Sequence, residues 1–179
     1  MDTQQFLISC LAAVVGFLGK SAWDMFWKTR ETQRSIAFEK RVMFLERQLE
    51  EFFWPLYIRL QHDNVVWQKI LDRQSDDQEL AAVAHEIETK TIITNHAAIV
   101  ELIRAKIHLA AGDENLETEL LSYLRHVSLY QAIRGANIWN RDPLQFGEPY
   151  PANLFKVVEL RTRELQVEYE KLLRLSGAA

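Results

Sequence analysis

The stretch "FLISCLAAVVGFLGKSAWDMFWK", residues 6–28, decides how this chain is organised. No charged residue occurs from Thr3 to Gly19, a run of 17 residues. Counted from Phe6 to Trp27, the apolar stretch has 22 residues. As a helix it would be roughly 33 Å long at about 1.5 Å per residue, enough to cross the hydrocarbon core of a bilayer. We therefore expect a transmembrane helix in residues 1–27, and the alternative is a buried core helix.

The residues around this stretch argue against a secretory signal and predict an orientation. Asp2 is the only charge before the apolar run, whereas a signal peptide carries positive charge there. No lysine or arginine precedes residue 20, whereas six basic residues occur from there to residue 41: Lys20, Lys28, Arg30, Arg34, Lys40 and Arg41. Because positive charge near a span stays on the cytoplasmic side, we expect the N-terminus outside and the rest of the chain in the cytoplasm.

One face of the expected span combines small and polar residues. Helices in lipid associate through small residues that allow close approach, so this face predicts a homo-oligomer. Lys20 and Asp24 continue the same row, where charge is expensive unless it faces a bundle interior or water. The alternative is that Lys20 reaches the headgroups and pairs with Asp24. The predicted pore or oligomer face contains Ser9, Ala12, Gly16, Lys20, Trp23, Asp24 and Trp27.

Residues 28–53 are predicted to form a juxtamembrane amphipathic helix. Its apolar positions recur at spacings of four and three, which is typical of a coiled-coil seam or of packing against a following domain. Two heptads are too few to decide between these two interpretations. Pro55 should kink the helix or restart it. The seam residues are Phe38, Val42, Leu45, Leu49 and Phe52.

Residues 54–179 are predicted to form a cytoplasmic helical bundle, which makes the chain all-α. Helical patterns cover residues 56–71, 79–111, 116–127 and 154–175, and the second is weakened around "TKTIITNH", residues 89–96. Gly112 should end one helix, and Asp113 or Asn115 should start the next. Residues 135–153 form a long loop of the kind that is often functional, and three aromatic residues should pin it to the bundle: Trp139, Phe146 and Tyr150.

The composition excludes several kinds of chemistry. The chain has 179 residues, a formal net charge of −4 and one cysteine, Cys10, so it offers neither a general basic field nor a disulfide or zinc framework. It contains no Gly-rich phosphate loop and no G-x-S-x-G turn. Three residues separate Arg104 from His108, whereas four to six residues separate the arginine from the histidine in HEPN-type ribonucleases. We expect a non-enzyme without cofactor or metal.

Two groups of residues are suited to an anionic ligand. His96 and Lys106 lie on the apolar side of their helix, where charge is unexpected. The segment "YLRHVSLYQAIR", residues 123–134, carries Arg125, His126, Tyr130 and Arg134. Arginine binds phosphate in a bidentate manner, and tyrosine can stack on a base. The alternative is that all six are satisfied polar groups of the bundle and its surface.

Four phrases carry a resemblance to a known group of proteins. They are "EFFWPLY" (51–57), "TNHAAIVELI" (94–103), "YLRHVSLYQAIR" (123–134) and "PYPANLFKVVELRTRELQVEYEKLL" (149–173). With the N-terminal span, the chain resembles small single-span bacterial membrane effectors of antiphage and CRISPR-associated defence systems, including pore-forming accessory proteins and Hailong-type effectors. The resemblance implies an oligomeric pore in the bacterial inner membrane whose soluble domain senses a nucleotide, nucleic acid or defence-system protein.

The expected function is therefore a pore or ion channel gated through the cytoplasmic bundle. The alternative is a membrane-tethered adaptor that recruits a cytoplasmic partner and conducts nothing. The row of Lys20 and Asp24 favours the pore, because a monomeric adaptor gives the small and polar face no purpose.

Overall fold

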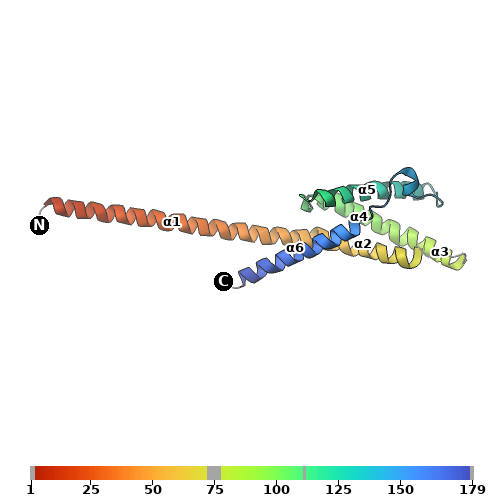
Figure 1. The fold of residues 1–179 in the computed structure, drawn as a ribbon, viewed down its shortest axis with the longest axis horizontal. Coiled ribbons are helices and arrows are strands. Elements are labelled where there is room, and N and C mark those ends of the chain that lie inside the picture. The colour runs from red at the N-terminus through yellow and green to blue at the C-terminus, as the bar shows by residue number, and fades with distance from the viewer. Residues whose placement is uncertain (1–2, 72–77, 111, 178–179) are drawn as a thin grey trace. The chain divides into compact units, whose positions relative to one another are not determined.

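The computed structural model describes residues 3–71, 78–110 and 112–177. The side chains of residues 3–16, 18, 70, 71, 78 and 176 lie outside that description. Every regular element within the described ranges is helical, so the predicted all-α class is confirmed. Figure 1 shows these helices along the chain. The chain divides into two compact units, Met1–Met43 and Phe44–Ala179.

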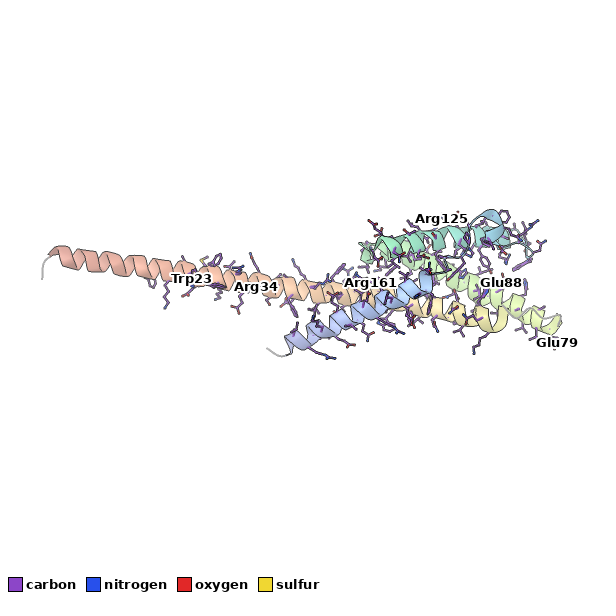
Figure 2. All side chains as sticks on the ribbon, viewed as in Figure 1. Trp23, Arg34, Glu79, Glu88, Arg125 and Arg161 are labelled. Carbon is purple, nitrogen blue, oxygen red and sulfur yellow. The ribbon has the colours of Figure 1, made fainter. Side chains whose placement is uncertain are left out.

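Helix α1, Thr3–Gln48, contains the whole apolar stretch of the sequence and ends in the second unit. Of the residues expected to cross a membrane, 3–27 are helical in backbone. Among the described residues, no helix is both long and apolar enough for a membrane span. Figure 2 locates Trp23 and Arg34 on α1, and Glu88, Arg125 and Arg161 in the second unit.

Pro55 is accommodated by a π-turn. The chain passes from α1 through η1, Leu49–Phe53, into α2, Trp54–Val66, with Pro55 in the first turn of α2. Proline has no backbone N–H and crowds the preceding turn. The wider turn relieves this, and the N–H of Trp54 donates to the carbonyl of Leu49 five residues earlier. The expected disturbance therefore occurs just before the proline, and the helix continues through it into η2, Trp67–Leu71.

The core of the second unit is formed by helices α2, α4, α5 and α6, which pack against one another in the pairs α2–α6, α2–α4, α4–α5 and α5–α6. Leu45, Leu49 and Phe52 of the predicted seam are buried in this core. For these three residues, packing within the bundle explains the seam without a coiled coil. Most of the remaining core residues are aliphatic: Leu56, Leu60, Ile99, Ile103, Leu116, Leu120, Val127, Leu154, Val158 and Leu165.

The predicted interruption between residues 79 and 111 is also a π-turn, the third after η1 and η2. Helix α3, Gln78–Ile87, continues through η3, Glu88–Ile92, into α4, Ile93–Lys106, and η4, Ile107–Leu109. Gly112 then has φ +96°, the left-handed conformation that glycine adopts readily. The Asp113 carboxylate caps α5, Glu114–Gly135, by accepting the N–H of Leu116 at 3.0 Å. Of the two predicted starting residues, Asp113 is the cap.

The long loop between α5 and α6 contains a short helix, η5, Pro143–Phe146, and α6 follows as Leu154–Ser176. Two of the three predicted aromatic anchors make ring contacts. Trp139 lies 4.3 Å from the ring of His85, and Tyr150 lies 5.9 Å from Tyr123. The prediction is wrong for Phe146, whose side chain is 56% exposed, because η5 turns it toward solvent.

Candidate functional site

A partly buried carboxylate, Glu88 on the η3 π-turn, organises one side of the bundle. Glu88 Oε1 accepts a hydrogen bond of 2.5 Å from Tyr130 Oη and one of 2.7 Å from Arg134 Nε. The side chains of Arg134 and Glu88 are 10% and 16% exposed, so this is a largely desolvated ion pair. Burial and the hydrogen bond to Glu88 raise the pKa of Tyr130, which stays protonated and donates.

Arg134 also holds the start of the long loop. Its Nη1 donates to the carbonyl oxygens of Ile138 at 3.0 Å and Arg141 at 2.7 Å. Its guanidinium carbon lies 5.3 Å from the centre of the Trp139 ring, a cation–π contact. The guanidinium that the sequence suggested for an anionic ligand is thus engaged by a carboxylate, two carbonyls and an aromatic ring.

A second polar pair joins α2 to α4. Asp63 Oδ1 accepts a hydrogen bond of 2.7 Å from Asn95 Nδ2, and Asp63 Oδ2 lies 3.3 Å from His96 Nε2. Burial raises the pKa of Asp63 and lowers the pKa of His96 to about 4. His96 is therefore neutral at pH 7, which makes it a core histidine with a carboxylate neighbour.

Three polar atoms around this pair have no hydrogen-bond partner in the described part of the chain: Asp63 Oδ2, His96 Nδ1 and Tyr123 Oη. The His96 ring lies between Tyr123 and Tyr130, at centroid distances of 5.8 Å and 5.5 Å. Burial, together with the nearby Tyr150 and Asp63, raises the pKa of Tyr123. A buried polar atom without a hydrogen-bond partner is destabilising unless water binds it, so these three atoms reduce the stability of this part of the core.

Lys106 does not join His96. Its Nζ donates to Glu51 Oε2 at 2.5 Å, which connects α4 to the η1 π-turn. That hydrogen bond is the main reason that the pKa of Glu51 is lowered. The two members of the first predicted anion site therefore contact different carboxylates, Asp63 and Glu51.

Arg125 and His126 both contact Glu148 of the loop. His126 Nδ1 lies 2.9 Å from the Glu148 carbonyl oxygen, so this nitrogen carries the proton and donates. Arg125 Nε donates to the Glu148 carboxylate at 3.3 Å, and its Nη2 donates to Ser122 Oγ at 3.1 Å. Burial lowers the pKa of His126, whose ring also packs edge-on against Tyr150 at 5.4 Å.

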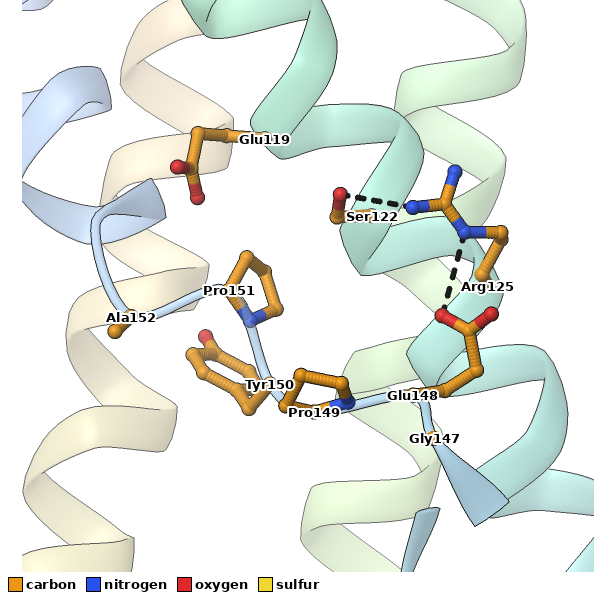
Figure 3. A pocket seen from close by; sticks show the side chains of 9 residues that line it. All are labelled: Glu119, Ser122, Arg125, Gly147, Glu148, Pro149, Tyr150, Pro151 and Ala152. Atoms are coloured by element: carbon orange, nitrogen blue, oxygen red, sulfur yellow. Dashed lines mark hydrogen bonds and ion pairs between the residues drawn. The ribbon is translucent and has the colours of Figure 1, made fainter. Parts of the chain in front are cut away.

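The ion pair of Arg125 and Glu148 borders two hollows in the surface of the second unit. One, of about 360 Å³, is lined by Glu119, Ser122 and Arg125 of α5 and by loop residues 147–152. Figure 3 shows this hollow with Tyr150 between Pro149 and Pro151 along its lower edge. The other hollow, of about 490 Å³, is mostly apolar and is lined by Leu124, Arg125, Ser128, Leu129, Ala132 and Glu148.

On the predicted pore face, Ser9, Ala12 and Gly16 lie among the residues whose side chains are not described. Lys20, Trp23, Asp24 and Trp27 are exposed in the first unit. The rings of Trp23 and Trp27 meet edge to face at 5.7 Å. No ion pair joins Lys20 to Asp24, although the structure describes both side chains. The intrahelical pair considered from the sequence is therefore not formed.

Sequence reasoning missed the carboxylates that engage the predicted cations, namely Glu51, Asp63, Glu88 and Glu148. The sequence contains a signal for Asp63. Leu60 follows Leu56 at a spacing of four and Asp63 follows Leu60 at a spacing of three, so Asp63 occupies a core-facing position of α2. No group of three or more candidate metal ligands occurs among the described residues. The chain matches no family model, no curated protein and no solved structure.

Proposed function

We propose that this protein is an oligomeric single-span membrane effector. It forms a pore or ion channel in a bacterial inner membrane, with residues 28 onward in the cytoplasm, and its helical bundle gates it in response to an antiviral defence signal. The observation that carries the proposal is the exposed row of Lys20 and Asp24, which follows 17 uncharged residues in one helix and contains no internal ion pair.

An exposed, unpaired cation and anion one turn apart are well placed to pair between neighbouring copies. Lys20 of one helix would lie near Asp24 of the next and form a ring of alternating charge at the cytoplasmic end of the pore. Such a ring sets which ions enter, and apolar rings such as Trp23 and Trp27 can narrow a passage and gate it by dewetting. Oligomerisation also replaces lipid around the charges with protein and water.

The continuity of α1 supports gating through the bundle. The helix that begins with the apolar run ends at Gln48, and Leu45 of the same helix is fully buried in the core of the second unit. Gln48 itself is buried and donates to the carbonyl of Leu109 at 2.6 Å. A change in how the bundle packs would therefore act directly on the end of α1. The π-turns η1, η2 and η3 offer places where the helical register can change at low cost.

The test has two measurements on the full-length chain. The mass of the detergent-solubilised particle should be a multiple of the 20.9 kDa chain. Liposomes that contain the protein should release a trapped dye or pass ions once the trigger is present. A monomer in mild detergent contradicts the proposal, and an oligomer that never conducts leaves the membrane-tethered adaptor as the function.

The signal itself is expected to be a nucleotide, an oligonucleotide or a cytoplasmic defence-system protein. The resemblance to antiphage effectors supports this choice. The placement of Arg125 beside a hollow supports a small anionic ligand more directly, since the other predicted arginine, Arg134, forms an ion pair with Glu88.

A further inference from the structure

Arg125 is the exposed arginine of the predicted anion site, and its present partner is replaceable. The Arg125 and Glu148 side chains are 58% and 34% exposed, and their contact is a single hydrogen bond of 3.3 Å. Exposed pairs of this kind contribute about 0.2–1 kcal/mol. The Glu148 side chain can therefore leave Arg125 for solvent at small expense, in contrast to the buried pair of Arg134 and Glu88.

The backbone around Glu148 allows its side chain to move while the rest of the loop keeps its place. Gly147 has φ +82°, and Tyr150 is flanked by Pro149 and Pro151, which restrict the backbone on both sides. The Tyr150 ring packs against His126 and Tyr123. The loop is thus anchored at Tyr150, and Glu148 is the adjustable part.

We propose that Glu148 occupies the place of a ligand oxyanion on Arg125, and that a phosphate ester binds the hollow by exchanging with it. Arg125 donates one N–H to Glu148 and one to Ser122, and its remaining N–H groups have no acceptor in the described part of the chain. A phosphate dianion carries more charge than the carboxylate and presents more acceptor oxygens to the guanidinium, so it competes well for this group.

Glu119 determines what the rest of the ligand must look like. Its carboxylate lines the same hollow six residues before Arg125, and its Oε2, which is buried, has no hydrogen-bond partner in the described part of the chain. A second anionic group next to Glu119 would be repelled, whereas an amino or hydroxyl group would donate to it. The ligand class is therefore a phosphate ester with hydrogen-bond donors at its other end, and a hollow of about 360 Å³ suits a molecule the size of a nucleoside monophosphate.

Binding of such a ligand would act on the bundle through Glu148. Its carbonyl accepts the His126 N–H, and its carboxylate holds Arg125, so both contacts fasten the loop to α5. Removing the carboxylate from Arg125 loosens one of the two. This consequence rests on the proposed function, because it takes the bundle as the part that receives the signal, whereas the exchange at Arg125 does not depend on a pore.

The test is equilibrium dialysis of the full chain in detergent at low salt, with two labelled probes, inorganic phosphate and adenosine 5′-monophosphate. Adenosine monophosphate should bind more tightly than inorganic phosphate. Glu148→Gln removes the internal competitor but keeps the backbone carbonyl, so it should tighten binding of both probes about 1.5- to 5-fold. Arg125→Ala should abolish binding of both. Glu119→Gln should weaken adenosine monophosphate alone.

The matched control is Glu159→Gln, which removes the same charge from an exposed pair with Arg163 on α6 and should leave both affinities unchanged. Unchanged or weaker binding in Glu148→Gln overturns the proposal, as does binding that survives Arg125→Ala. Circular dichroism identifies any variant that fails to fold, and Arg125→Lys, with reduced but measurable binding, then replaces Arg125→Ala. Dye release is scored separately, so binding without leakage contradicts the pore, and leakage without binding contradicts the exchange.

Discussion

Asp63 Oδ2 lies 3.3 Å from His96 Nε2 in the core of the bundle, and this contact joins α2 to α4. Both residues are buried, and neither the Oδ2 atom nor the other ring nitrogen of His96 has a hydrogen-bond partner among the described residues. Burial disfavours the charged form of His96 and so lowers its pKa, which leaves the ring neutral in this core.

The bundle should lose stability in mild acid. The pKa of His96 falls from an ordinary 6.5 to about 4 on folding, so the unfolded chain binds the proton more tightly. Stability from this group is present above pH 6.5 and declines as the pH falls toward 4. A shift of this size corresponds to about 3 kcal/mol. Asp63, whose pKa is raised, acts in the opposite direction and loses stability as the pH rises.

Urea unfolding at pH 7, 5.5 and 4.5 measures this effect. His96→Gln should flatten the dependence between pH 6.5 and 4, and the exposed control His108→Gln should leave it unchanged. A dependence that is the same in His96→Gln and in the wild type would show that the lost stability comes from other groups.

Glu88→Ala should destabilise the bundle by about 1–3 kcal/mol. The substitution leaves the partly buried Arg134 guanidinium without its carboxylate, and removing one partner of such a pair is unfavourable. The double variant Glu88→Ala/Arg134→Met should lose less than the single variant, because it leaves no unpaired charge. Denaturant unfolding measures both, with Glu86→Ala from the exposed pair with Lys90 as the control. A loss no larger than that of the control contradicts the prediction.

Two buried tyrosines should respond oppositely to removal of the hydroxyl. Tyr130 donates to a carboxylate at 2.5 Å, so Tyr130→Phe should reduce the free energy of unfolding by about 1.5–3 kcal/mol. Tyr123 Oη has no partner among the described residues, so Tyr123→Phe should be neutral or slightly stabilising. A loss for Tyr123→Phe comparable to that for Tyr130→Phe would mean that water satisfies the Tyr123 hydroxyl.

Exchanging the charges of Lys20 and Asp24 tests pairing between copies. Lys20→Asp or Asp24→Lys alone places like charges in the ring and should weaken the oligomer and dye release. The double exchange restores opposite neighbours and should recover both. Gly16→Leu should disrupt the oligomer independently, because a bulky residue prevents close helix packing. If single and double variants all assemble and conduct as the wild type does, Lys20 and Asp24 are headgroup anchors and the adaptor becomes the better proposal.

The sequence by itself determined the helical class and the approximate positions of the interruptions, and it narrowed the cap of α5 to Asp113 or Asn115. These features depend on local physics: apolar spacing defines a buried face, proline lacks an N–H, Gly112 adopts positive φ, and Asp113 caps within its own turn. Spacing also identified His96 and Lys106 as polar residues on an apolar face. It could not show what those residues contact.

Only the tertiary structure decided which carboxylate meets which cation. Asp63 and Asn95 are 32 residues apart, and Glu88 and Arg134 are 46 apart, on separate helices. Helical periodicity reports which side of a helix is buried, but the partner depends on how the helices pack and on the register that the π-turns set. Four of the predicted cationic residues, His96, Lys106, His126 and Arg134, therefore each contact a group of the bundle or its loop. The fifth, Arg125, is exposed, and its partner Glu148 comes from a loop that no periodicity could position.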